Sequence, residues 1–319
     1  MDGLPLGDIL MGLFGGLALF LLGMEQMAGA LKSVAGDRMR WVLARLTGNR
    51  FAGVLTGAFV TAVIQSSSVT TVLVVGFVSA GLMTLTQSVG VIMGANIGTT
   101  VTAQIVAFKV TEYALALVAL GFAVAFVART DRIKQYGTML LGLGLVFFGM
   151  AVMSGAMQPL KGHPPFIEAL AQAANPLTAV AMGAVFTALV QSSSATTGIV
   201  IVLASEGFIP LEMGIALAFG ANIGTCVTAL LATIGKPREA LRAAVIHALF
   251  NVLGVVLWIG LIGPLADLVR ILSPVAENLQ GTARLAAEAP RQIANAHTLF
   301  NVINTAIFIW FTNPLARLV

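Results

Sequence analysis

The sequence predicts an all-α polytopic membrane protein built from inverted structural repeats, and two observations carry this prediction. The first is composition: of 319 residues, 58% are hydrophobic and only 9% are charged, whereas soluble domains have about 25% charged residues. Polar groups are too few to cover a globule of this volume, so lipid must solvate much of the surface. The second observation is a repeat at one fixed spacing.

Matched residues recur 126 positions apart. Gln65–Ser68 returns as Gln191–Ser194, and Gly94–Thr99 returns letter for letter as Gly220–Thr225. From residue 57 to residue 103, 23 of 47 positions match their partners without a gap, which chance does not produce. We therefore expect a first repeat at 1–130, a second at 131–263, and a third part at 264–319 with an external amphipathic connection and a final transmembrane helix.

Each copy contains four apolar segments, and a single membrane span needs about 20 apolar residues. Expected segments are 9–31, 53–80, 85–108, 111–128, 136–157, 177–205, 211–234 and 240–263, with a last one at 293–312.

The two segments that carry Gln-Ser-Ser-Ser are the longest and have the polar run at their centre. Each is either one long tilted helix or a re-entrant hairpin of two half-helices that meet at a polar tip. The hairpin is favoured because four consecutive polar side chains cannot all face one side of a helix. Hairpins give three crossings per copy and invert the second copy. That topology puts twelve of the 17 Lys and Arg residues inside, as the positive-inside rule favours for a protein of the cytoplasmic membrane.

Each predicted tip offers groups for an anion and for a cation. The half-helix that ends there leaves carbonyl oxygens for a sodium ion, and the half-helix that begins there offers N–H groups and a positive dipole end to an anion. We expect Ser67, Ser68, Ser193 and Ser194 to cap the starting half-helices or to donate hydrogen bonds to an oxyanion.

The two Gly-Ala-Asn-Ile-Gly-Thr segments are interpreted as a second pair of helix breaks, because glycines flank an asparagine that tolerates left-handed geometry. Alternatively, the glycines permit close packing while Asn and Thr bond neighbouring helices. The predicted substrate-binding residues are Gln65, Ser66, Ser67, Ser68, Gln191, Ser192, Ser193, Ser194, Asn96 and Asn222. The predicted sodium-binding residues are Gln65, Ser66, Thr70, Thr99, Thr100, Gln191, Ser192, Thr196 and Thr225.

No Arg or Lys lies within a predicted membrane core, so a bound anion has no fixed cationic partner. A divalent oxyanion would need bound cations, since each helix terminus offers only about half a charge. This requirement couples anion to cation and favours cotransport over a passive channel. Proton coupling is disfavoured because the tips contain no carboxylate or histidine. Neither an organic cofactor nor a nucleic-acid partner is expected, since the basic residues lie in short loops.

Three further residues invite a role. Glu25 in the first span matches Ala151, and it is either a functional carboxylate or the partner of a loop arginine. His247 and His297 each begin a His-x-Leu-Phe-Asn run, interpreted as hydrogen bonding between helices. A serine hydrolase is disfavoured because both histidines are distant in sequence from the serines and no Gly-x-Ser-x-Gly elbow occurs.

The doubled Gln-Ser-Ser-Ser and Gly-Ala-Asn-Ile-Gly-Thr motifs resemble the type II sodium/phosphate cotransporters and their bacterial relatives, from about residue 10 to residue 312. The resemblance implies sodium-coupled movement of inorganic phosphate, an elevator-like motion of a core domain against a scaffold, and a homodimer. It also implies that both Gln-Ser-Ser-Ser runs bind phosphate and sodium. Cys226 replaces Thr100 in the second copy, so the half-sites differ chemically. Alternative functions are transport of another oxyanion, such as sulfate or a carboxylate, and phosphate export.

Overall fold

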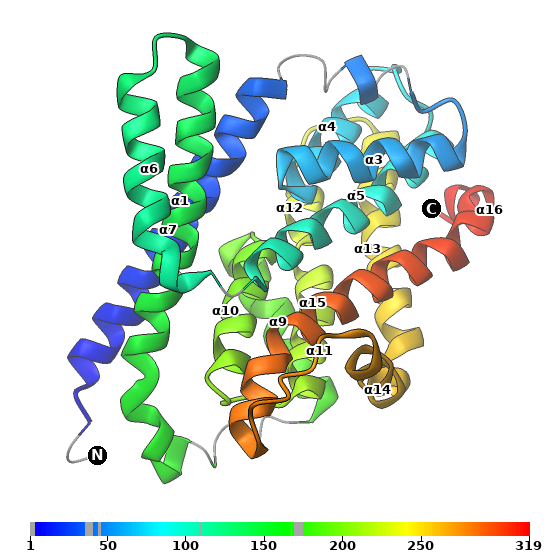
Figure 1. The fold of residues 1–319 in the computed structure, drawn as a ribbon. Coiled ribbons are helices and arrows are strands. Elements are labelled where there is room, and N and C mark those ends of the chain that lie inside the picture. Colours follow the sequence, from blue (N-terminus) through cyan, green and yellow to red (C-terminus); the bar gives the residue numbers. More distant parts are fainter. Residues whose placement is uncertain (1–3, 36–40, 44–45, 109, 167, 169–174) are drawn as a thin grey trace.

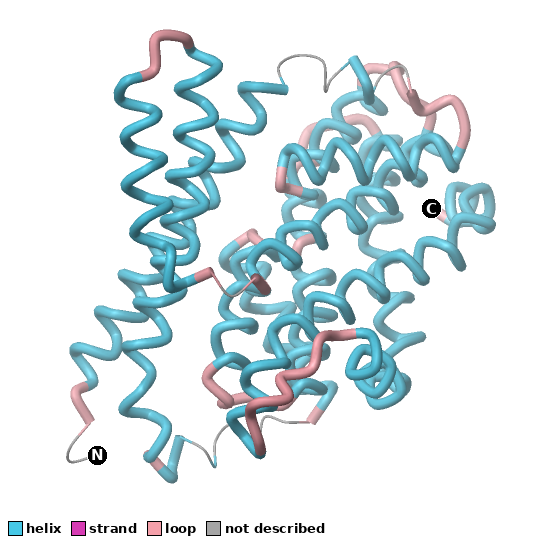
Figure 2. The backbone as a smooth tube through the Cα atoms, viewed as in Figure 1, coloured by secondary structure: helices cyan, strands magenta, loops and turns pink. Residues whose placement is uncertain are grey.

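The computed structural model describes residues 4–35, 41–43, 46–108, 110–166, 168 and 175–319. These residues form helices joined by short loops, without a strand (Figure 2). Six of the helices are long and apolar enough to cross a membrane, by length and composition. The α-helices are α1 Leu6–Ala35, α3 Arg50–Ile64, α4 Ser67–Ser79, α5 Leu85–Val106, α6 Ala114–Val127, α7 Asp131–Met157, α9 Pro176–Val190, α10 Ser193–Ser205, α11 Leu211–Gly224, α12 Cys226–Leu231, α13 Arg238–Trp258, α14 Ile262–Leu272, α15 Gly281–Phe308 and α16 Thr312–Leu318.

Helices α1, α6 and α7 form a bundle at one side of the molecule (Figure 1), which we call the three-helix bundle. Glycines let α1 and α7 cross backbone to backbone. A Cβ atom at Gly16 would lie 2.8 Å from the carbonyl oxygen of Gly149, and one at Gly23 would lie 2.6 Å from that of Gly142. Close approach through small residues is the usual way in which membrane helices gain packing contacts.

The remaining helices form a second body that holds both polar runs, which we call the core body (Figure 1). In the core body α3 packs on α5, and α9 packs on α11. The contacts are made by residues that correspond to each other in the repeat. A Cβ atom at Gly94 would collide with the carbonyl oxygen of Val54, and one at Gly220 would collide with that of Val180. Each pair of helices is therefore locked by a glycine of the Gly-Ala-Asn-Ile-Gly-Thr segment.

This packing overturns the predicted helix break in the first copy. Helix α5 runs without interruption through Asn96, because its glycines serve close approach to α3 and not a turn. In the second copy α11 ends at Gly224 and α12 begins at Cys226, so only Thr225 leaves the regular helix.

The C-terminal region is more helical than expected. Helix α15 begins at Gly281, well before the predicted start at residue 293, and it continues through Pro290. One order of elements also occurs twice: α13, a 3-10 turn and α14, then α15, a 3-10 turn and α16. Pro264-Leu265-Ala266 and Pro314-Leu315-Ala316 occupy matching places in the two short helices.

Replacing Gly220 by alanine tests the packing of α9 on α11. The added methyl group would collide with the backbone of α9, and overpacking of this kind costs about 1–3 kcal/mol. We expect Gly220→Ala to lower the thermal unfolding temperature of the detergent-solubilised protein. Gly155→Ala is the control, because its Cβ would meet nothing within 4 Å; equal unfolding temperatures for the two variants would contradict the packing.

Candidate functional site

Both Gln-Ser-Ser-Ser runs interrupt a helix at the same point. Helix α3 ends at Ile64 and α4 begins at Ser67, and Gln65 between them has φ 60°. The second copy repeats this geometry, with Gln191 at φ 56° between α9 and α10. Within the described residues, these glutamines are the non-glycine residues with positive φ. Such a conformation is uncommon outside glycine, so it marks a position that the surrounding structure enforces.

The residue that caps each starting helix is the first serine of the run. The hydroxyl oxygen of Ser66 accepts a hydrogen bond from the N–H of Val69, and that of Ser192 accepts one from the N–H of Ala195, each at 3.2 Å. The capping role expected for Ser67, Ser68, Ser193 and Ser194 is wrong, and their alternative role as donors to an oxyanion stays a prediction. Those four residues already lie in the first helical turn. A capping residue has an extended backbone, and here only Ser66 and Ser192, which directly precede the helices, have one.

Paired threonines hold the two arms of each break together. The hydroxyl of Thr61 on α3 donates to that of Thr70 on α4 at 2.9 Å, and Thr187 and Thr196 make the corresponding bond at 2.6 Å. All four side chains are buried. The two tips are therefore built alike, with a hydroxyl pair one turn below each run.

The two tips meet at one cavity of about 250 Å³. Its walls combine both polar runs with one face of α1, on which four residues line the cavity. The lining residues are Leu21, Met24, Glu25, Ala28, Gln65, Ser66, Ser67, Ser68, Gln191, Ser192, Ser193 and Ser194. Eight predicted site residues from distant parts of the chain thus come together, and no Arg, Lys or His is among these lining residues.

The cavity offers hydrogen-bond donors from two helix starts. The first intrahelical bonds run from Thr70 N–H to Ser66 C=O and from Thr196 N–H to Ser192 C=O, each 3.2 Å. The N–H groups that precede Thr70 and Thr196 in each first turn have no helical acceptor, and the helix dipoles add positive potential there. The serine hydroxyls supply further donors. Such an arrangement suits an oxyanion.

The two half-sites are not equivalent. Gln65 is buried, and its side-chain oxygen accepts a hydrogen bond from Thr102 of α5 at 2.8 Å. Gln191 is exposed, and Thr228, which matches Thr102 in the second copy, has a buried hydroxyl without a partner among the described residues. The first tip also bonds the second copy, through Ser68 and Thr225 at 3.1 Å.

Asn96 and Asn222 do not line the cavity. Their side-chain amides donate to Asn251 at 2.7 Å and to Asn301 at 3.0 Å, and His297 contacts Asn222 at 3.0 Å. These bonds tie α5 to α13 and α11 to α15. The two His-x-Leu-Phe-Asn runs thus supply the partners of the two Gly-Ala-Asn-Ile-Gly-Thr segments.

Thr99 and Thr100 are not among the residues that line the cavity either. Their hydroxyls donate to the backbone oxygens of Ala95 at 3.1 Å and of Ile97 at 2.7 Å. Because a hydroxyl that donates to a carbonyl keeps its lone pairs, both threonines remain oxygen donors for a cation.

Sequence reasoning named Glu25 as a candidate functional carboxylate, but it missed the other residues of the α1 face that closes the cavity, and it missed Thr102. Leu21, Met24, Glu25 and Ala28 have the spacing of one helical face, a signal that was present but did not show which face meets the tips. Thr102 recurs as Thr228 in the repeat. The repeat therefore marked the position but did not show that Thr102 donates a hydrogen bond to Gln65.

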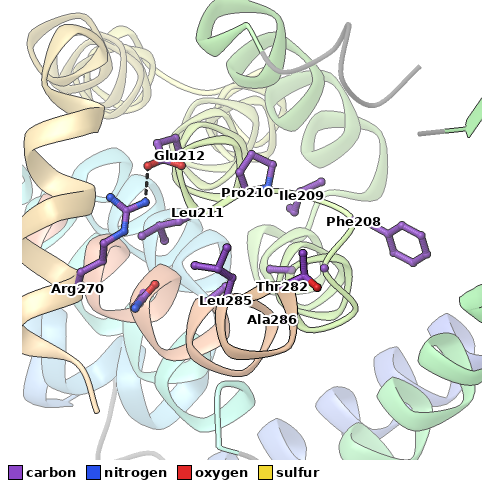
Figure 3. Close-up of a pocket in the computed structure, with 13 residues that line it drawn as sticks. Phe208, Ile209, Pro210, Leu211, Glu212, Arg270, Thr282, Leu285 and Ala286 are labelled. Atoms are coloured by element: carbon purple, nitrogen blue, oxygen red, sulfur yellow. Dashed lines mark hydrogen bonds and ion pairs between the residues drawn. The ribbon is translucent and has the colours of Figure 1, made fainter. Parts of the chain in front are cut away.

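A second cavity of about 330 Å³ lies between the α10–α11 loop, α14 and α15 (Figure 3). Most of its lining is apolar, as Leu211 and Leu285 illustrate. Its charged groups, Glu212 and Arg270, face each other and form an ion pair at 2.5 Å. Because these charges neutralise each other, this cavity does not offer the convergent donors of the serine-lined one.

Comparison with known proteins identifies the family. The family model described as Na+/Pi-cotransporter matches residues 19–155 and 160–274. The chain belongs to this family. The resemblance inferred from the paired motifs is therefore confirmed, and with six helices of spanning length among the described residues the chain is a multi-pass membrane protein of a transporter family.

Individual proteins are also similar to the chain. The chain is 33% identical over 80% of its length to an uncharacterized protein, YqeW, of Bacillus subtilis, covering 83% of that protein. It is 29% identical over 83% of its length to a putative inorganic phosphate export protein, YjbB, of Salmonella typhimurium, but spans only 49% of that relative. The mouse sodium-dependent phosphate transport protein 2C is 39% identical over 31% of this chain and 16% of its own. No solved structure matches the chain.

A double-mutant cycle tests the asparagine contact behind the cavity. Because Asn96 and Asn251 form a buried hydrogen bond, replacing both by alanine should cost less than the sum of the single replacements, with a coupling of about 0.5–3 kcal/mol in unfolding free energy. The cycle Asn96→Ala with Asn301→Ala is the control, since Asn301 pairs with Asn222. Additive effects in the first cycle would contradict the contact.

Proposed function

We propose that the chain is a sodium-coupled secondary transporter of inorganic phosphate that works by alternating access across the cytoplasmic membrane. The observation that carries the proposal is the single cavity lined by both Gln-Ser-Ser-Ser tips. Phosphate is the proposed anion because relatives are named as sodium-dependent phosphate transport and putative phosphate export proteins.

The charge balance of the cavity supports sodium coupling. Its lining includes hydroxyls, amides, two helix starts and the carboxylate of Glu25, but no Arg, Lys or His among the described residues. Two helix termini of about half a charge each do not neutralise a divalent anion. Bound cations would complete the balance. Oxygen donors for them are proposed to come from the two tips together with Thr70, Thr99, Thr100, Thr196 and Thr225.

Re-entrant hairpins of inverted orientation fit this function. Helices α3, α4, α9 and α10 have 13 to 15 residues each, which is too short to span a bilayer. Non-helical backbone at membrane depth is tolerated where it lines a polar cavity, as both tips do here. Broken segments of two opposed repeats are the common plan of secondary-transporter sites.

Ser67→Ala and Ser193→Ala test the site itself. Each variant removes a hydroxyl donor from the cavity, and a hydrogen bond to a charged group is worth about 1.5–3 kcal/mol. Sodium-dependent uptake of labelled phosphate into proteoliposomes should fall at least tenfold in each variant.

Ser79→Ala is the matched control for these variants, because Ser79 closes the opposite end of α4. It should transport as the unsubstituted protein does. Phosphate uptake that continues unchanged without sodium would contradict the coupling. A panel of sulfate and carboxylate competitors would identify another oxyanion as the substrate.

The direction of transport has a second candidate. The Salmonella relative is named as a putative phosphate export protein, so net export is the alternative to uptake. Proteoliposomes with opposed sodium and phosphate gradients distinguish the two directions, because the coupled ion determines which way phosphate accumulates.

The contact between the two bodies supports an elevator-like motion. Phe20 of α1 is fully buried against Gly198 of α10, which is an apolar contact. Within the described residues, the polar side-chain contacts between the bodies all converge on Glu206, at the end of α10. Its carboxylate pairs with Lys161 at 2.7 Å and accepts a hydrogen bond from Gln158 at 2.7 Å, both in the 3-10 turn Gln158–Gly162 that continues α7 of the three-helix bundle, and one from Ser154 of α7. The residue that matches Glu206 in the first copy is Ala80. We therefore propose that the Glu206 contacts stabilise only one of the two end positions of the core body.

Glu206→Gln should free the core body from the three-helix bundle. The ion pair with half-exposed Lys161 is worth up to about 1 kcal/mol, so the equilibrium should move several-fold away from the observed arrangement. Gly155 and Ser205 line one cavity between the bodies, so cysteines placed at both positions in a Cys226→Ala background can be cross-linked. The shift in the equilibrium should appear as slower cross-linking of these cysteines in Glu206→Gln. Glu212→Gln breaks an ion pair within the core body and should leave the rate unchanged; equal rates in both variants would argue against the tie.

A further inference from the structure

The cavity lined by both Gln-Ser-Ser-Ser runs is called the serine cavity below. Among the described residues that line it, Glu25 is the one with a charged side chain. It is exposed, and it lies on α1 with Leu21 and Ala28 on the same face. An ionisable residue in the middle of an apolar helix is costly unless it serves a site. Within the described residues, no hydrogen bond or ion pair occupies its carboxylate.

The packing of the three-helix bundle does not need this carboxylate. Helices α1 and α7 cross through glycines that match at the repeat spacing. At the position on α7 that corresponds to Glu25, the residue is Ala151. Two matching helices with the same glycine contacts therefore differ at this position. Helix α1, which faces both tips, has the carboxylate, and α7 has an alanine.

A carboxylate opposite two anion-attracting helix starts has a specific chemical consequence. It repels an oxyanion that carries no proton, because an ionised carboxylate only accepts hydrogen bonds. It attracts an oxyanion that carries a hydroxyl, because an O–H···O⁻ bond is short and strong. Phosphate retains at least one P–OH group near neutral pH, whereas sulfate retains none.

We propose that Glu25 is a specificity-determining residue, which accepts a hydrogen bond from the hydroxyl of a protonated oxyanion and excludes oxyanions that lack one. The proposal rests on the proposed function, in that it takes the serine cavity as the anion site. The tips supply donors to the anion's unprotonated oxygens, and Glu25 supplies the negatively charged acceptor. Sites that combine an attractive and a repulsive element in this way achieve discrimination that attraction alone does not.

Glu25→Gln removes the negative charge at nearly constant size and adds an amide N–H donor beside the remaining carbonyl acceptor, so the side chain no longer repels an oxyanion that lacks a hydroxyl. The test measures equilibrium binding of labelled phosphate and of labelled sulfate to the purified full chain in detergent with sodium, alongside competition by sulfate during phosphate uptake into proteoliposomes. We expect the phosphate-to-sulfate affinity ratio to fall at least tenfold in Glu25→Gln. Glu25→Asp keeps the acceptor and should keep phosphate preferred even if affinity declines.

Glu239→Gln is the matched control, since Glu239 is an exposed carboxylate in the first turn of α13 and outside the cavity. Its affinity ratio should equal that of the unsubstituted protein. An unchanged ratio in folded, monodisperse Glu25→Gln overturns the proposal. So does a change confined to the sodium concentration needed for half-maximal binding, because Glu25 would then be a cation ligand.

The two proposals fail in different ways. If the unsubstituted protein neither binds nor transports phosphate, the proposed function is wrong and Glu25 has no phosphate to select. If the unsubstituted protein transports phosphate with sodium and Glu25→Gln discriminates equally well, the function stands and the inference about Glu25 falls.

Discussion

Helix starts whose N–H groups have no helical acceptor are the constraint on which this molecule depends, because lipid cannot satisfy them. The left-handed backbone of Gln65 and Gln191 ends one helix and starts the next within two residues. Each serine cap satisfies a single donor. The others need a polar cavity, and the chain supplies one by bringing both breaks to the same place. The glycine-lined helix contacts and the asparagine pairs behind the tips hold the breaks there.

The duplicated motifs build the cavity from two similar halves, and departures from the duplication make those halves unequal. The tips share their caps and their threonine pairs. The surroundings differ: Gln65 is docked on Thr102 while Gln191 is exposed, and Glu206 has only Ala80 as its counterpart. A symmetric machine would have two end states of equal energy. Under the proposed alternating access, one-sided polar contacts would make these energies unequal, and a ligand shifts such an equilibrium only by its differential affinity for the two states.

Part of this site was predictable because some residue types leave few alternatives. Four polar residues in an apolar segment required a break, and the structure has one at each run. Ser66 and Ser192 could not be told from the other serines as caps, since the choice depends on which residue is extended. The expected break near Asn96 was wrong because glycine serves both turns and close packing. The sequence pattern is the same for both uses, and only the position of α3 decides between them.

The sequence by itself determined the membrane environment, the doubled motifs and the family, because composition and spacing are properties of the chain alone. Only the tertiary structure decided that the tips share one cavity, that Asn96 and Asn222 bond helices behind it, and that Glu25 faces it. The physical reason is that these facts depend on how distant helices pack, and packing between α1, α4 and α10 leaves no periodic signal in any one of them.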